Sequence, residues 1–317
     1  MRTVRYHEHG DESVLQVEEL STPEPGEDEL MVRVEAASVN PVDTYFREGT
    51  YPTPDLPWIP GSDVAGVVEQ AGPNSGFVEG DRVFATGLGK DQPGTCAEYA
   101  VVPTDLAAPL PDSVPFERAA AGALVGVTAW QALVAAGALA PGERALVHGG
   151  SGGVGHVAVQ LAAAMGADVT TTAAPRYHDR LEELGAMDVF DYTSDNLADN
   201  ISDAGAPDVI LDHRLDEYLG FDCQVAAAGG RIAAIGNKDL EATFPHVPLA
   251  RSKTISVHHV GVFDTPNISS ILSRLSRLFK REGVIPAVEE CYDLDEIREA
   301  HRTVLEESYF GKLVVVP

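Results

Sequence analysis

A glycine-rich segment in the middle of the chain restricts the fold more than any other part of the sequence. It reads Gly149-Gly150-Ser151-Gly152-Gly153-Val154-Gly155, and it joins an apolar run that ends at His148 to a helical stretch. Gly150, Gly152 and Gly155 have the G-x-G-x-x-G spacing of a dinucleotide-binding turn. Without Cβ atoms the turn can tighten, the backbone can approach a pyrophosphate, and the helix N-terminus can offer free N–H groups to the phosphates. The segment therefore predicts a dinucleotide site; the alternative is a tight glycine turn without a ligand.

The sequence pattern changes on either side of this turn. Residues 1–110 contain short β-prone runs divided by Pro and Gly clusters: 30–34, 64–69, 82–85 and 98–102. From Ala145 onward, strand-like and helical runs alternate: 145–148, 154–165, 169–172, 180–184, 209–211 and 231–235. This alternation indicates βαβ units and a parallel sheet. The C-terminal part predicts an amphipathic helix over 267–280, another helix over 295–307 and a final strand over 312–316.

The residues after the second strand of the βαβ unit distinguish NADP from NAD. An NAD site usually places Asp or Glu there to bind the ribose hydroxyls. This chain instead has Thr170-Thr171-Thr172-Ala173-Ala174-Pro175-Arg176, and Asp168 lies at the opposite end of the strand. Hydroxyl groups together with Arg176, or with Arg180, suit a 2′-phosphate. We therefore predict NADPH as the cofactor, bound in part by Thr171, Thr172 and Arg176; the alternative is that Arg176 is an exposed loop cation.

The charge composition excludes a nucleic-acid partner. The chain has 49 acidic and 22 basic residues, which gives a net charge of −27, and only five of the cations are lysine. Proteins that bind nucleic acids need a basic surface to neutralise phosphates. An acid-rich, lysine-poor surface is interpreted here as that of a cytoplasmic protein from a halophile. The alternative is an ordinary acidic enzyme from a mesophile.

Cysteine usage and hydropathy point to a soluble protein without structural cross-links. Cys96, Cys223 and Cys291 lie far apart, which argues against a disulfide framework and against a zinc lobe with four thiolates. The N-terminus lacks the apolar run of a signal peptide. Residues 119–140 carry no charge and reach membrane-span length, but they are mostly Ala and Gly. They predict a buried helix, and no membrane partner is expected.

An ordered series of further motifs resembles the zinc-independent quinone oxidoreductases of the medium-chain dehydrogenase/reductase superfamily. The series covers the whole chain: Asn40-Pro41-Val42-Asp43-Thr44-Tyr45, Pro60-Gly61-Ser62-Asp63-Val64-Ala65-Gly66-Val67-Val68, Gly80-Asp81-Arg82-Val83-Phe84, Ala97-Glu98-Tyr99, Thr128-Ala129-Trp130, the glycine turn and Gly311-Lys312-Leu313-Val314. The resemblance implies an α/β protein with two domains. One is a GroES-like β-rich catalytic domain, 1–122 and 266–317; the other, 123–265, is a Rossmann domain with a doubly wound parallel sheet that binds NADPH. By analogy it also implies a homodimer.

The resemblance further implies which residues form the catalytic site. It puts Asn40, Asp43, Tyr45 and Tyr51 around the acceptor pocket near the nicotinamide. There Asn40 offers an amide donor, and a tyrosine hydroxyl can donate a hydrogen bond or a proton to the reduced oxygen. Two alternatives stay open: Asn40 and Asp43 organise a turn around Pro41, and the two tyrosines are half-buried packing residues.

The resemblance implies a larger set of residues on the cofactor side. These are Gly150, Ser151, Gly152, Gly153, Val154, Thr128, Tyr192, Asn237 and Lys312. Tyr192 matches a position that borders the adenosine phosphate; its alternative is a plain strand tyrosine. Asn237 matches a position near the nicotinamide; its alternative is a turn residue.

No metal site is expected. Zinc members of the superfamily have Cys where this chain has Asn40 and His where it has Ser62, and neither replacement is a usual zinc ligand. The four-cysteine lobe of those members is replaced by the short segment 87–96. The pairs His7-x-His9 and His258-His259 each lack a third ligand.

Without a metal Lewis acid, the acceptor should be one that takes a hydride readily. We therefore predict an NADPH-dependent oxidoreductase whose acceptor is a quinone or a conjugated carbonyl compound. One alternative is an enoyl-thioester or alkenal double-bond reductase, and another is a non-catalytic NADPH-binding protein with a structural or regulatory role. The segment Leu211-Asp212-His213-Arg214-Leu215 departs from the family, in which small residues follow the strand Asp. Two bulky polar side chains there either reshape the pocket or point to solvent.

Overall fold

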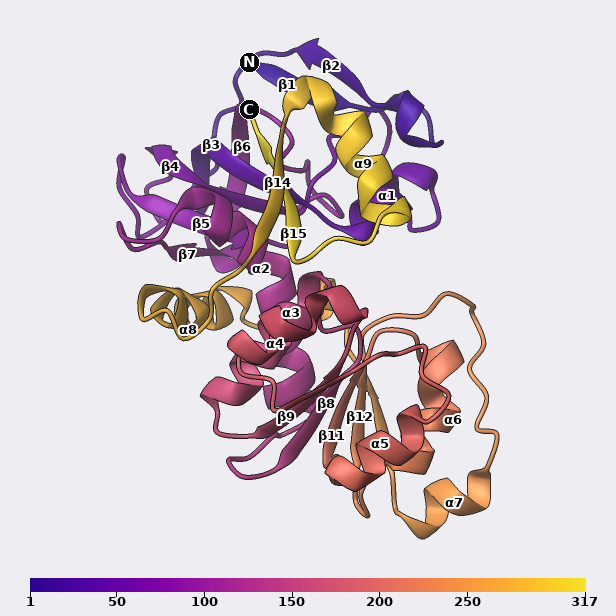
Figure 1. Ribbon diagram of the computed structural model, residues 1–317. Helices are drawn as coiled ribbons and strands as arrows, with labels where there is room; N and C mark the ends of the chain where they lie inside the picture. The colour runs from indigo at the N-terminus through magenta and orange to yellow at the C-terminus, as the bar shows by residue number, and fades with distance from the viewer. The chain divides into compact units, whose positions relative to one another are not determined.

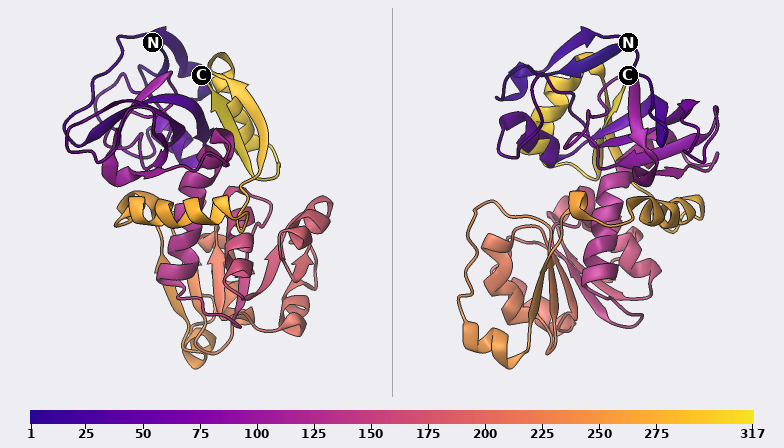
Figure 2. Two further views of the ribbon diagram at one scale, coloured as in Figure 1. Left: turned by 90° about the vertical axis from the view of Figure 1, so that its left-hand side faces the viewer. Right: turned by 180° about the vertical axis from the view of Figure 1, so that it is seen from behind.

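Both ends of the chain contribute to one structural unit, and the middle of the chain forms the other (Figure 1). In the computed structural model, which describes residues 1–317, unit 1 comprises Met1–Leu124 with Thr265–Pro317, and unit 2 comprises Val125–Asp264. The two termini lie close together in unit 1 (Figure 2). The divisions at 124/125 and 264/265 lie next to the expected domain boundaries, 122/123 and 265/266.

Unit 1 is built on a mixed sheet in which only one pair of strands is parallel. The strand order is β14-β15-β3-β4-β5-β7, and β6 also pairs with β3. The strands are β3 (Glu29–Val39), β4 (Asp63–Ala71), β5 (Arg82–Thr86), β6 (Tyr99–Pro103), β7 (Ala107–Pro109), β14 (Val288–Asp293) and β15 (Lys312–Val316), and β1 (Arg2–Arg5) with β2 (Gln16–Glu19) forms a separate antiparallel pair. The register aligns Ser38 of β3 with Val314 of β15 on one side and with Asp63 of β4 on the other. This alignment brings the buried polar residues Ser38 and Asp63 side by side.

Four helices belong to unit 1 in whole or in part. They are α1 (Pro41–Glu48), α2 (Phe116–Trp130), α8 (Ile268–Lys280) and α9 (Ile297–Glu306). Helix α8 buries one apolar face, which includes Ile271, Leu275 and Phe279, as its amphipathic sequence predicts. It contacts the short strand β7, and α9 contacts β15.

A buried arginine fixes helix α1 in unit 1. Arg47 is 1 % exposed; its Nε donates to the Gly10 carbonyl at 3.0 Å, and its guanidinium also contacts His301 Nδ1 of α9 at 3.2 Å. Burial and this guanidinium lower the pKa of His301 to about 3, so the imidazole is neutral and can accept. A third contact joins Arg47 to Glu48. The helix that carries Tyr45 is therefore tied to two distant parts of the chain.

Unit 2 is a six-stranded parallel sheet with helices on both faces. Its strands, in the order β10-β9-β8-β11-β12-β13, are β10 (Asp188–Phe190), β9 (Asp168–Thr172), β8 (Arg144–Val147), β11 (Val209–Asp212), β12 (Arg231–Ala234) and β13 (Ser256–His259). Every pair in this sheet is parallel. The chain builds outward from β8 in one direction and then from β11 in the other, so the strand order reverses between these two strands. In doubly wound sheets this reversal marks the place where ligands bind.

The helices of unit 2 complete the doubly wound arrangement. They are α3 (Gly153–Ala164), α4 (His178–Glu183), α5 (Leu197–Ala204), α6 (Leu215–Val225) and α7 (Val247–Ser252). Figure 1 shows α3 and α4 on one side of the sheet and α5 and α6 on the other. Apolar residues of the sheet, such as Leu146 and Ile210, pack with Ile201 of α5 and Leu219 of α6 in one core cluster. This architecture confirms the predicted α/β class with a parallel sheet.

One helical stretch is long and apolar enough to cross a membrane by length and composition alone. It consists of α2 and the π-helical turn that follows, Gln131–Ala136. Of its most apolar 18-residue window, 72 % is buried inside the structure. Core helices of water-soluble proteins pass the same test, and the burial agrees with the core helix predicted over 119–140.

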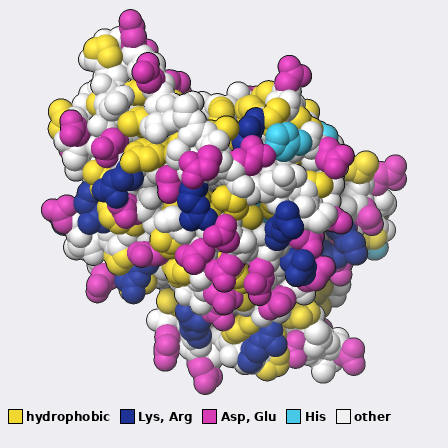
Figure 3. Space-filling view, turned by 90° about the horizontal axis from the view of Figure 1, so that it is seen from above, with side chains coloured by type: hydrophobic (Ala, Val, Ile, Leu, Met, Phe, Trp, Pro, Cys, Tyr) yellow, Lys and Arg dark blue, Asp and Glu magenta, His cyan; other side chains and the backbone are white.

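Acidic side chains are spread over the face of the protein shown in Figure 3, with fewer basic side chains among them. This distribution follows from the net charge of −27. The halophilic interpretation stays a prediction.

Candidate functional site

The glycine turn lies at the carboxyl end of β8, beside the point where the strand order reverses. Gly149 has a φ of +67°, a conformation that glycine adopts without strain. The Gly150 N–H donates to the Thr172 carbonyl at 2.9 Å, and the Gly152 N–H donates to the Gly149 carbonyl at 3.0 Å. These bonds close the turn against β9 and bring the chain directly into α3.

Two of the three fingerprint glycines are required by packing within the protein. A Cβ on Gly150 would lie 2.1 Å from Thr171 Oγ1, and a Cβ on Gly155 would lie 2.1 Å from the Gly149 carbonyl oxygen. Both distances are far below van der Waals contact, so these glycines allow the turn to lie against β9 and the helix to lie against the turn. They explain the fold of the turn without reference to a ligand.

The third glycine is not explained by the protein's own packing. Gly152 has ordinary backbone angles, φ −74° and ψ 176°, and a Cβ there would have one close neighbour, the Gly149 carbonyl oxygen at 3.3 Å. Any residue could adopt these backbone angles, and the Cβ would be tight against that one oxygen only, at a distance that a shift of a few tenths of an ångström relieves. A bare backbone at this position leaves room for a group outside the protein to approach, which is what a bound pyrophosphate needs.

The N-terminus of α3 has the chemistry to bind an anion. Gly152 is its N-cap residue, no side chain caps its N–H groups, and its first turn contains no acidic residue. The positive end of the helix dipole is therefore not neutralised from within the helix. The predicted residues Gly150, Ser151, Gly152, Gly153 and Val154 lie together in this turn, and their geometry fits a dinucleotide pyrophosphate.

Thr171 and Thr172 support the turn from below. Both are buried; Thr171 Oγ1 donates to the Val147 carbonyl at 2.7 Å, and Thr172 Oγ1 accepts from the Gly149 N–H at 3.2 Å. Their hydroxyl groups are engaged within unit 2. Direct contact of either hydroxyl with the cofactor stays a prediction.

Further predicted cofactor residues lie beyond the carboxyl ends of neighbouring strands. Arg176 follows β9, is exposed, and lies with its guanidinium carbon 4.7 Å from the centre of the Tyr177 ring. Tyr192 follows β10, which pairs with β9, and it is 52 % exposed. No acidic side chain follows β9 in the segment that ends at Arg176. This edge of the sheet can therefore accept a phosphate group more readily than a site with a ribose-binding carboxylate.

The remaining cofactor candidates have different surroundings. Asn237 is exposed after β12, and its side chain closes a turn by donating to the Asp239 carbonyl at 3.0 Å. Thr128 is buried in α2. Lys312 belongs to unit 1, where its ammonium group donates to the Val39 carbonyl at 2.5 Å and to Asn40 Oδ1 at 2.6 Å. Because Lys312 is 2 % exposed, a cofactor contact would require this group to leave both partners.

The predicted catalytic residues of unit 1 are gathered at helix α1. Asn40 is the N-cap residue, and Asp43 reaches back to accept from the Asn40 N–H at 2.8 Å, which forms a capping box. The Asn40 amide donates to Asp63 Oδ2 at 2.8 Å, and its oxygen accepts from Lys312. Asn40 is 1 % exposed. Its amide is thus engaged in organising the turn, as the alternative interpretation expected; a role as donor to the acceptor stays a prediction.

Asn40 belongs to a buried network of charged and polar groups. Asp63 Oδ2 also accepts from Ser38 Oγ at 2.6 Å, and Asp63 Oδ1 accepts from the Leu124 N–H at 2.8 Å. Ser62 Oγ donates to Asp43 Oδ1 at 2.6 Å. Burial raises the pKa of Asp43 to about 6, although these hydrogen bonds favour its ionised form. Burial likewise raises the pKa of Asp63 and lowers that of Lys312, and the attraction between the opposite charges opposes both shifts.

Tyr45 of helix α1 and Tyr51, which follows the helix, form an aromatic pair. Their ring centroids are 5.5 Å apart, and the rings meet edge to face. Tyr45 is half-buried, whereas Tyr51 is 44 % exposed. Burial, followed by the neighbouring Tyr51 and Glu48, raises the pKa of the Tyr45 hydroxyl. The hydroxyl is therefore protonated at neutral pH and can act as a hydrogen-bond donor.

The donor set around Asn40 does not suit a metal ion. The Asn40 and Ser62 side chains are both hydrogen-bonded to buried carboxylates. The structure contains no group of three His, Cys, Asp or Glu side chains arranged to hold a metal. The residues thus favour hydrogen-bond chemistry at this position over Lewis-acid chemistry.

Three buried residues at the reversal of strand order were given no role by the sequence, although His148 and Asp212 lie in segments that it singled out. His148 ends the segment before the glycine turn, Asp212 ends β11, and Asp222 lies on α6. His148 Nε2 lies 2.8 Å from Asp222 Oδ1. Next to Asp212, the His213 ring covers Gly149: its Cε1 would lie 3.0 Å from a Cβ at that position. A sequence signal existed, because an Asp directly after a buried apolar strand is costly unless it is paired.

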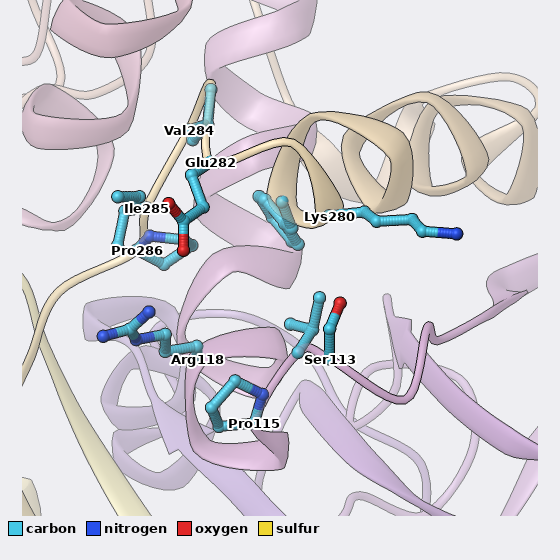
Figure 4. Close-up of a pocket in the computed structure, with 10 residues that line it drawn as sticks. Ser113, Pro115, Arg118, Lys280, Glu282, Val284, Ile285 and Pro286 are labelled. Atoms are coloured by element: carbon cyan, nitrogen blue, oxygen red, sulfur yellow. The ribbon is translucent and has the colours of Figure 1, made fainter.

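A separate small cavity lies in unit 1 at the N-terminus of α2. Its volume is about 80 Å³, and it is lined by residues that include Pro115, Arg118, Glu282 and Pro286. Figure 4 shows Lys280, another lining residue, with its ammonium group pointing away. A cavity of this size is well below the volume of pockets that hold cofactors or drug-sized ligands.

Comparisons with known proteins agree with this architecture. Residues 26–112 match the family model described as an alcohol dehydrogenase GroES-like domain, and residues 184–315 match one described as a zinc-binding dehydrogenase. The human quinone oxidoreductase is 32 % identical over 325 residues, which cover 100 % of this chain and 98 % of that protein. The crystal structure of an NAD-dependent alcohol dehydrogenase has a TM-score of 0.93 with 31 % identity and full coverage of both chains. That of the Escherichia coli quinone oxidoreductase complexed with NADPH has a TM-score of 0.89 with 26 % identity, again with full coverage of both.

Proposed function

This chain belongs to the quinone oxidoreductase family of the medium-chain dehydrogenase/reductase superfamily, and from that premise we propose that it reduces quinones or conjugated carbonyl compounds with NADPH and without a metal ion. The observation that carries the proposal is the glycine turn, where the open side of Gly152 lies beside the uncapped N-terminus of α3. The similarity to a quinone oxidoreductase structure complexed with NADPH supports the choice of cofactor. The setting is expected to be cytoplasmic and the protein a homodimer.

The cofactor supplies a hydride when it is bound, so the chain's own residues bind, orient and stabilise. The N–H groups of α3 and the bare backbone at Gly152 would hold the pyrophosphate. Arg176 would pair with the 2′-phosphate, because a guanidinium matches the geometry of a phosphate. The protonated Tyr45 hydroxyl would donate a hydrogen bond to the acceptor oxygen as negative charge develops there.

The preference for NADPH over NADH is expected to depend on Arg176. The Arg176→Ala variant should raise the KM for NADPH about tenfold, because one charge-assisted contact with a phosphate is lost. The KM for NADH should change little. Steady-state kinetics with both cofactors measure the two values, and Arg180→Ala on α4 tests the other cation named for this role. If neither variant changes the ratio of the two KM values, the assignment of this edge to a 2′-phosphate is wrong.

The role of Tyr45 is tested by removing a single oxygen atom. Tyr45→Phe should lower kcat with a quinone by about 100-fold, the lower end of what a positioned proton or hydrogen-bond donor contributes. The Kd for NADPH should stay within about twofold, since the ring and its contact with Tyr51 are kept. Tyr99→Phe on β6 is the matched control. An unchanged kcat in Tyr45→Phe would show that Tyr45 is a packing residue and does not donate to the acceptor.

The acceptor class is tested by a panel of quinones, enones and simple alcohols with both cofactors. We expect rapid oxidation of NADPH with quinones, slower turnover with conjugated carbonyls and none with alcohols. Turnover with enones only would support the cofactor assignment, but it would show that the reaction is the reduction of a double bond. Binding of NADPH without turnover of any acceptor would point to a non-catalytic cofactor-binding protein.

A further inference from the structure

Three titratable side chains lie buried where the two halves of the parallel sheet meet, and the proposed reaction does not use them. His148 is 2 % exposed, and Asp212 and Asp222 are 0 % exposed. They come from three elements: the segment after β8, the end of β11, and the last turns of α6. Burying ionisable groups is costly unless they are paired, so their arrangement needs a physical explanation.

The contacts of this cluster account for His148 but not for the charge of the two carboxyl groups. His148 Nε2 lies 2.8 Å from Asp222 Oδ1, and its ring stacks on Tyr218 with centroids 4.6 Å apart. Asp212 Oδ1 accepts from the Arg214 N–H at 2.6 Å. The two carboxyl groups lie close enough for each to influence the pKa of the other. Asp212 Oδ2 and Asp222 Oδ2 are both buried, and no donor group of the protein reaches either of them.

A single shared proton would satisfy both carboxyl groups. A carboxylate has no donor, so a hydrogen bond between two carboxyl groups requires that one of them be protonated. Two buried carboxylates in contact cannot both ionise without strong repulsion. No cation neutralises them: burial lowers the pKa of His148 to about 4, and the Arg214 guanidinium instead pairs with Glu217.

The cluster is joined to the first residue of the glycine turn, Gly149, in two ways. His148 directly precedes Gly149, and its ring is held by Asp222 and Tyr218 of α6. Asp212 directly precedes His213, whose ring covers Gly149. A movement of either carboxyl group would therefore shift the first residue of the turn or the side chain that covers it.

We propose that Asp212 and Asp222 share one proton in the folded protein and, with His148, position the glycine turn, so that loss of this proton weakens cofactor binding. Asp212, Asp222 and His148 are thus positioning residues. The link to binding rests on the proposed function, whereas the shared proton can be tested in the protein alone.

The direction of the pH effect follows from both carboxyl groups. Burial, together with the neighbouring carboxylate, raises the pKa of Asp212, and burial raises that of Asp222 to about 8. Between about pH 4, where an unfolded Asp titrates, and about pH 8, the folded pair holds one proton that the unfolded chain has lost. Stability is therefore expected to fall as the pH rises through this window. Other ionisable groups around the pair are His148, His213, Arg214, Tyr218 and Cys223.

Asp222→Asn tests the shared proton directly, because an amide imitates a protonated carboxyl. Its Nδ2 can donate to Asp212, and its Oδ1 can accept from His148. Urea unfolding is measured from pH 5 to pH 8. The unfolding constant of the unchanged protein should rise with pH more steeply than that of Asp222→Asn, and the difference should be up to tenfold per pH unit for one proton. Asp203→Asn, an exposed site on α5, should keep the original slope.

Two outcomes of this unfolding experiment would overturn the shared proton. One is an Asp222→Asn slope equal to that of the Asp203→Asn control. The other is a failure of both Asp222→Asn and Asp212→Asn to fold, since each amide should replace the proton that the pair holds.

The effect on the turn is read from NADPH binding, measured by fluorescence titration between pH 7 and pH 9.5. The Kd of the unchanged protein should rise about tenfold across this range, and that of Asp222→Asn less than about twofold. Asp222→Ala, which breaks the contact with His148, should bind more weakly at every pH. An equal rise in Kd with and without the Asp222→Asn change would contradict the positioning role. Absence of NADPH binding in every protein would contradict the proposed function instead, and the unfolding slopes would still decide the shared proton.

Discussion

A methyl group at position 152 should weaken NADPH binding far more than it disturbs the fold. In Gly152→Ala the new Cβ has one close neighbour in the protein, the Gly149 carbonyl oxygen at 3.3 Å, and the backbone angles suit any residue. The methyl group instead occupies the space that a pyrophosphate would need. We expect the Kd for NADPH to rise at least about 100-fold, which corresponds to about 2.7 kcal/mol. Fluorescence titration of NADPH and thermal unfolding of the same sample measure the two effects.

Gly150→Ala provides the contrasting variant in the same turn. Its Cβ would lie 2.1 Å from Thr171 Oγ1, so the turn must move away from β9 and the protein should lose stability. Glycine-to-alanine changes at two neighbouring positions thus separate a defect of binding from a defect of folding. If Gly152→Ala binds NADPH as tightly as the unchanged protein, the cofactor does not lie at this turn.

Removal of the Lys312 ammonium group should cause a large loss of stability. Lys312 is buried and donates to Asn40 Oδ1, and Asn40 in turn donates to Asp63. In Lys312→Met the side chain keeps a similar volume, but the buried carboxylates lose their cation. The Lys312 charge favours the ionised forms of Asp43 and Asp63, and removing one member of a buried set of opposite charges costs up to about 3–5 kcal/mol. Urea denaturation of Lys312→Met measures this loss, with Lys280→Met, an exposed position on α8, as the control.

A second variant shows whether the loss comes from uncompensated charge. Lys312→Met combined with Asp63→Asn removes one charge of each sign, and part of the stability should return. The family resemblance, by contrast, assigns Lys312 to the cofactor. A Lys312→Met protein with unchanged stability and much weaker NADPH binding would support that assignment and refute the structural role.

Local patterns in the sequence were sufficient to predict the parallel sheet and the glycine turn. The alternation of apolar runs with helical stretches defines βαβ units from residues that are neighbours in the chain. The spacing of Gly150, Gly152 and Gly155 has the same local character, and the amphipathic helix α8 lies where its periodicity placed it. Such features depend on short-range geometry, which a sequence displays directly.

Local sequence patterns could not predict contacts between distant parts of the chain. Asn40 was expected to face the acceptor, but its partners Asp63 and Lys312 lie 23 and 272 residues away in sequence. Only the register of β15, β3 and β4 brings these groups together. The proximity of Asp212 to Asp222 likewise depends on how α6 packs against β11. Sequence patterns indicate which residue types are present, but the free energy of burying them depends on partners that the fold supplies.

The most direct test of the proposed function is NADPH oxidation by the protein after exhaustive dialysis against a metal chelator. A quinone serves as the acceptor, with NADH in a parallel assay, and the metal content is checked before each measurement. The proposed reaction predicts that the rate with NADPH is unchanged by chelation and well above the rate with NADH. Loss of activity on chelation, with recovery on addition of zinc and oxidation of simple alcohols, would contradict it.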